Sequence, residues 1–104
     1  MLIEVLYVPG CPNHQPAVES LRRVLRIEAM SVPILEVAVT DEAMARLLQF
    51  PGSPTVRING RDAEPSRQPS YGLACRLYPG RKGLPSFETL QRAVALAKVE
   101  GAGT

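Results

Sequence analysis

Residues 2–14 read Leu-Ile-Glu-Val-Leu-Tyr-Val-Pro-Gly-Cys-Pro-Asn-His, an apolar stretch that stops at Pro9-Gly10. Apolar side chains fall on both faces of residues 2–8, with Ile3, Val5 and Tyr7 together on one of them. This pattern is typical of a strand covered on both sides, as in an α/β sheet. Proline followed by glycine then ends the strand and turns the chain.

Beyond this turn the apolar residues recur at helical spacing, which predicts a helix over about residues 12–30. Residues 34–39 are again strand-like. Two strands joined by one helix favour a parallel βαβ unit. Ligands of such sheets bind beyond the carboxyl ends of the strands, so the turn at residues 9–14 is the expected site.

A short helix is predicted next, with Thr40 as its cap and Pro51-Gly52 at its end. Residues 53–58 read as a strand, and the Asn59-Gly60 pair that follows is a strong hairpin signal. We therefore expect residues 61–64 to return antiparallel.

The last part of the chain holds an irregular segment and a helix. Residues 65–85 are rich in proline and glycine and are expected to form an irregular arm. Ser86 is the candidate cap of a helix over about residues 87–99. The predicted order is βαβαββα, an α/β fold with a mixed four-stranded sheet and helices on both faces.

Length and composition limit the possible classes of protein. The chain has 104 residues, room for one domain over residues 1–100, with a flexible tail at residues 101–104. A formal net charge of +2 gives no electrostatic case for nucleic acid, and the apolar runs are too short for a membrane span. The first residues lack the features of a signal peptide, which favours a cytoplasmic protein. Composition does not distinguish a monomer from a homodimer.

Two cysteines, Cys11 and Cys75, are too few for a disulfide framework. A thiol at the start of a helix faces unpaired amide hydrogens, which favours the thiolate. His14 follows three residues later, so we expect Cys11 and His14 to share a proton as thiolate and imidazolium. The alternatives are a small buried apolar residue for Cys11 and a solvated polar one for His14.

The element order and two motifs, Gly10-Cys11-Pro12-Asn13-His14 and Gly52-Ser53-Pro54-Thr55, resemble the thioredoxin/glutaredoxin superfamily. The resemblance spans about residues 1–64 and 86–99. It looks closest to a small bacterial group of thioredoxin-like proteins with selenoprotein relatives, which also share a segment similar to residues 71–76. In the superfamily the active-site motif is Cys-x-x-Cys; here Cys11 matches its first cysteine, and His14 stands at the second.

The resemblance implies a thioredoxin-like fold in which Cys11 is the nucleophile. It also implies that Pro54 is a cis-proline facing the turn, with the backbone of the preceding Ser53 open to an extended substrate. Pro12 and Asn13 would be the other substrate-binding residues. A trans proline that begins an edge strand is the alternative for Pro54.

Cys75 has two interpretations. If the arm brings it near Cys11, it resolves a mixed disulfide formed there. Otherwise it is an inert core thiol on an apolar face with Tyr71, Leu73 and Leu77. Basic side chains on or near the arm either attract the carboxylates of a glutathione-like thiol or belong to a solvated loop; they are Arg67, Arg76, Arg81 and Lys82.

The leading hypothesis is a thiol–disulfide oxidoreductase that needs no cofactor and acts on a thiol or disulfide, in a protein or a small molecule. A second is a binding protein for a soft metal such as Hg(II), Cu(I) or Zn(II), held by Cys11, His14 and Cys75. A third is a binding module that keeps the fold without catalysis.

Overall fold

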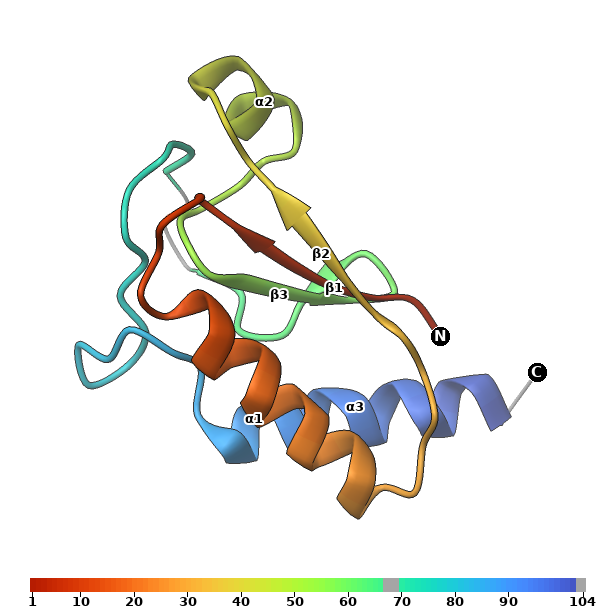
Figure 1. Cartoon of the computed structure of the whole chain (residues 1–104). Helices are drawn as coiled ribbons and strands as arrows, with labels where there is room; N and C mark the ends of the chain where they lie inside the picture. Colours follow the sequence, from red (N-terminus) through yellow and green to blue (C-terminus); the bar gives the residue numbers. More distant parts are fainter. Residues whose placement is uncertain (67–69, 103–104) are drawn as a thin grey trace.

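A computed structural model describes residues 1–66 and 70–102, and it has the predicted order of elements. Arg67, one of the basic residues considered above, lies outside the described residues. The elements in chain order are β1 Ile3–Tyr7, α1 His14–Ile27, β2 Ile34–Ala38, α2 Glu42–Leu47, β3 Thr55–Ile58, β4 Arg61–Asp62 and α3 Phe87–Ala102 (Figure 1).

The strands form a mixed four-stranded sheet, as predicted, and their order in the sheet is β2-β1-β3-β4. β1 pairs parallel with β2 and antiparallel with β3, and β3 pairs antiparallel with β4. Asn59 and Gly60 join β3 to β4 with φ of 54° and 80°. Positive φ at both central residues is what a tight hairpin turn of the predicted kind requires.

Two apolar clusters lie on opposite faces of the sheet. Ile3 and Val5 of β1 pack with α1 and α3, while Leu6 packs with α2 and Phe50. Helices therefore lie on both faces, although α2 is short and sits beyond the end of β2 (Figure 1). Leu35 on β2 consequently stays 46% exposed.

The ends of the helices differ in part from the prediction. The cap of α2 is Asp41, not Thr40: the Asp41 carboxylate accepts from the Met44 N–H at 2.7 Å, and carboxylates are among the strongest capping groups. Ser86 is the cap of α3, as predicted, and its hydroxyl accepts from the Thr89 N–H at 3.1 Å. α3 continues to Ala102, so Gly101 belongs to the helix and not to the predicted tail.

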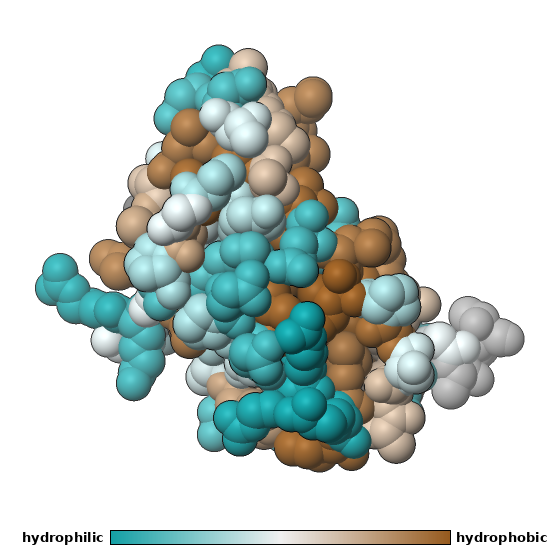
Figure 2. Space-filling view, viewed as in Figure 1, coloured by the Kyte–Doolittle hydropathy of each residue, from teal (hydrophilic) through white to brown (hydrophobic). Residues whose placement is uncertain are grey.

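The arm at residues 65–85 is irregular where it is described, but it is attached to the sheet. Its two isolated bridges join Ser53 to Cys75 in parallel and Tyr78 to Lys82 antiparallel. Figure 2 shows hydrophilic side chains over the outer side of α1 and hydrophobic ones along β2. Over the described residues, every helix is too short or too polar to traverse a lipid bilayer.

Candidate functional site

Cys11 lies in the turn between β1 and α1, two residues before Asn13, the N-cap of α1. Its N–H donates to the Val8 carbonyl at 3.0 Å, and its carbonyl accepts from the His14 N–H at 3.2 Å. The side chain is partly buried and the cysteine is free. The helix begins at His14, not at residue 12. Cys11 therefore precedes the first turn of the helix and does not belong to it.

His14 is turned toward β2, not toward Cys11. Its Nε2 lies 2.6 Å from Oε1 of Glu36, and its ring stacks on that of Tyr7 with the centroids 3.6 Å apart and the planes at 6°. Within the described residues no hydrogen bond joins the imidazole to the Cys11 thiol. The predicted Cys11–His14 side-chain pair is therefore not formed. The parallel register sets Glu36 opposite Val5, on the face that α1 covers, and a carboxylate is a stronger acceptor than a thiol.

The peptide bond between Ser53 and Pro54 is cis, as the motif led us to expect. Ser53 is 2% exposed, and its hydroxyl accepts from the Val8 N–H at 2.9 Å. This bond ties the turn that carries Cys11 to the beginning of β3.

The backbone of Ser53 is not open to a substrate, contrary to the expectation. Its N–H donates to the Ala74 carbonyl at 2.9 Å, and its carbonyl accepts from the Arg76 N–H at 3.0 Å. The arm thus occupies the edge at which an extended chain was expected to pair. The residue it places opposite Ser53 is Cys75.

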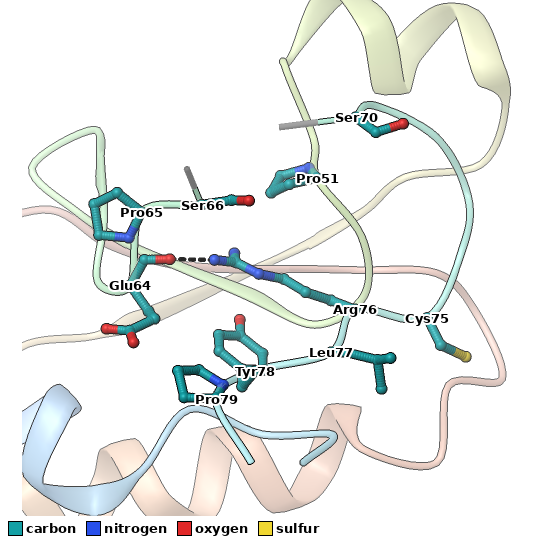
Figure 3. Close-up of a pocket in the computed structure, with 10 residues that line it drawn as sticks. All are labelled: Pro51, Glu64, Pro65, Ser66, Ser70, Cys75, Arg76, Leu77, Tyr78 and Pro79. Carbon is teal, nitrogen blue, oxygen red and sulfur yellow. Dashed lines mark hydrogen bonds between the residues drawn. The ribbon is translucent and has the colours of Figure 1, made fainter. Parts of the chain in front are cut away.

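Cys75 is exposed and free, so the interpretation as an inert core thiol is wrong. Around Cys75, the side chains of the arm face the opposite way from that interpretation. Arg76 and Tyr78 point inward, and Leu77 is 65% exposed. In Figures 1 and 3 the chain around Cys75 passes beside the β1–α1 turn. Figure 3 also shows the sulfur pointing away from the Arg76 guanidinium.

Arg76 anchors the arm and is not a surface charge for substrates. Its side chain is 6% exposed; Nη1 lies 2.7 Å from Oδ2 of Asp62 and 3.1 Å from the Thr55 hydroxyl. The guanidinium also donates to the Glu64 carbonyl and lies 4.4 Å from the centroid of the Tyr78 ring (Figure 3). This buried ion pair could not be predicted from the sequence, because the irregular arm carries no pattern that shows which of its side chains point inward.

Tyr78 completes the contact between the arm and β3. Its hydroxyl donates to the Pro54 carbonyl at 2.6 Å, and burial raises the pKa of the phenol above its ordinary value. Beside Tyr78 the arm and Pro51 border a cavity of about 680 Å³ (Figure 3). Cys75 is among the residues that line it, although its sulfur points away from the Arg76 guanidinium on the same lining (Figure 3).

The remaining predicted site residues differ in exposure. Pro12 is exposed, and Pro54 is buried. Asn13 is covered by the arm: a Cβ added at Gly83 would lie 2.3 Å from Asn13 Nδ2. The structure therefore gathers the predicted residues around one turn, apart from the side chain of His14.

The described residues contain no group of three or more His, Cys, Asp or Glu side chains placed to hold a metal ion. The soft-metal hypothesis required the side chains of Cys11, His14 and Cys75 to converge, and the imidazole is instead bonded to Glu36.

Comparisons of the chain with known protein families, with curated proteins and with solved structures found no match. The function is therefore inferred from the positions and contacts of the site residues alone.

Proposed function

We propose that the protein is a thiol–disulfide oxidoreductase of the thioredoxin-like class, with Cys11 as nucleophile and Cys75 as resolving cysteine. The observation that supports it is the position of both cysteines relative to Ser53. The turn of Cys11 is bonded to the Ser53 hydroxyl through Val8, and Cys75 is bridged to the Ser53 backbone. A partly buried thiol and an exposed one thus flank the same residue, next to a cis-proline.

The reaction conserves atoms and electrons as follows. The Cys11 thiolate attacks one sulfur of a substrate disulfide, forms a mixed disulfide and releases the other half as a thiolate. The Cys75 thiolate then attacks the Cys11 sulfur and releases the second half. Two electrons pass from the two protein thiols to the substrate, and a Cys11–Cys75 disulfide remains. An external thiol reduces that disulfide and restores the enzyme.

The arm narrows the class of substrate. Both backbone hydrogen-bonding groups of Ser53 are already paired with Ala74 and Arg76. A substrate that needs to add itself as a strand at Ser53 would have to displace the arm and its buried Arg76–Asp62 pair. We therefore favour disulfides that reach the thiols without strand pairing, above all small-molecule disulfides.

The first test replaces each cysteine with serine and measures reduction of a small aromatic disulfide with dithiothreitol as the reductant. Cys11→Ser should lower the rate to the level of dithiothreitol alone, because the attacking sulfur is gone. In a single turnover without dithiothreitol, reduced Cys75→Ser should react once and accumulate a mixed disulfide on Cys11, visible as added mass, whereas the wild-type chain should release both halves of the substrate. Ser31→Ala, distant from the turn, is the control. Full activity of Cys11→Ser would refute the proposal.

A further inference from the structure

Glu36, His14 and Tyr7 form a compact group beside the turn of Cys11. The His14 side chain is 14% exposed and the Glu36 side chain 36%, and Nε2 and Oε1 are 2.6 Å apart. The Tyr7 ring covers one face of the imidazole in a nearly parallel stack. The stack on Tyr7 fixes the plane of the imidazole, and the bond to Glu36 fixes which nitrogen faces β2, so the two contacts together hold the ring in one orientation.

The second ring nitrogen, Nδ1, has no hydrogen-bond partner among the described residues. No side-chain nitrogen or oxygen in this part of the chain is both buried and unpaired. Nδ1 is therefore accessible to solvent. Because a carboxylate only accepts, the neutral ring bonded to Glu36 carries its proton on Nε2. Nδ1 then has a free lone pair.

We propose that Glu36 is a positioning residue of the site, which fixes the His14 imidazole so that Nδ1 serves as its proton acceptor. The inference rests on the proposed function. Nδ1 takes the proton of the Cys11 thiol through solvent, which leaves the thiolate to attack, and Glu36 stabilises the imidazolium. When the substrate disulfide breaks, Nδ1 returns the proton to the departing thiolate, so the proton count balances.

Few charged groups compete with Glu36 for this ring. Tyr7 of β1 stacks on the ring, and Glu36 of β2 is hydrogen-bonded to it. Cys11 is bonded to His14 only between backbone groups of the described chain. The first turn of α1 holds no acidic residue. Glu36 is thus the only carboxylate hydrogen-bonded to His14 within the described residues, which makes its removal a clean test.

The test measures the alkylation rate of Cys11 in a Cys75→Ser background, where Cys11 is the one remaining thiol. Glu36→Gln and His14→Asn should each slow the reaction near neutral pH by about tenfold, the factor for loss of one charge-assisted hydrogen bond. The double variant should be no slower than His14→Asn alone, because Glu36 acts through His14. Glu19→Gln, on the exposed side of α1, is the matched control and should leave the rate unchanged.

A spectroscopic measurement separates positioning from a merely structural role. His14 is the one histidine of the chain, so NMR signals of imidazole nitrogens can come from no other residue. In wild-type protein at about pH 9, where imidazoles are neutral, the proton should be on Nε2. A proton on Nδ1, additive rate losses, or an unchanged rate in Glu36→Gln would each overturn the inference. Alkylation does not depend on substrate turnover, so these results are distinct from a failure of the oxidoreductase proposal, which Cys11→Ser reports.

Discussion

Tyr78 connects the arm to β3, and its ionisation gives stability a pH dependence. Burial raises the pKa of its phenol, so the folded chain holds the proton more tightly than the unfolded chain. The stabilisation is complete below about pH 10, and the free energy of unfolding then falls by up to about 1.4 kcal/mol per pH unit. Urea unfolding at about pH 8 and about pH 11 measures this loss. Tyr78→Phe should reduce it and Tyr71→Phe, an exposed control, should not; equal losses in both variants contradict the prediction.

At the same scale, the sequence predicted the local features of the candidate site better than the partners of its side chains. The motif placed Cys11 in the turn and Pro54 as cis, because both follow from local sequence. The partner of His14 depends on the register that sets Glu36 opposite Val5, and no local pattern contains that register. Arg76 was predicted as a surface charge for the same reason, since its carboxylate partner, Asp62, lies on the far strand of the hairpin.

Among the connecting elements, the arm docks on β3 so closely that Gly52 has no room for a side chain. A Cβ there would lie 2.9 Å from the Arg76 Cβ and 3.1 Å from the Ala74 carbonyl oxygen, at a φ of +132°. We expect Gly52→Ala to lower the free energy of unfolding by about 3 kcal/mol, because overpacking adds to backbone strain. Gly60→Ala is the matched control: its φ is also positive and its Cβ meets nothing within 4 Å.

The control should cost only about 1 kcal/mol, since backbone strain alone remains. Chemical denaturation of both variants gives the comparison. Equal losses would mean that the contact between the arm and Gly52 contributes nothing to stability. Because the Ser53 bridge depends on the same docking, Gly52→Ala should also make the arm more susceptible to trypsin, whereas Gly60→Ala should not.

Sequence patterns predicted most elements, because each depends on residues near one another in the chain. The strand at residues 34–39 and the hairpin at Asn59-Gly60 carry their own local signals, and both are present. The arm has no such periodicity: its course follows from Ser53, to which it bonds across more than twenty residues. A sequence with prolines and glycines at this density predicts irregularity but not the surface on which the irregular chain packs.

Across the whole molecule, the two thiols lie on segments that are both bonded to Ser53, so an oxidised bond between them would cross-link the N-terminal turn to the arm. A cross-link over a loop of this length is expected to stabilise the fold by about 4 kcal/mol through the entropy of the unfolded chain. Oxidation with oxidised glutathione should therefore raise the urea midpoint and protect both Cys11 and Cys75 from alkylation. Cys75→Ser cannot form the bond, so its midpoint should stay unchanged, and Cys11 should instead carry one glutathione, visible as added mass. If the oxidised wild-type chain keeps two reactive thiols and an unchanged midpoint, the arm does not deliver Cys75 to Cys11, and a different thiol must resolve the mixed disulfide.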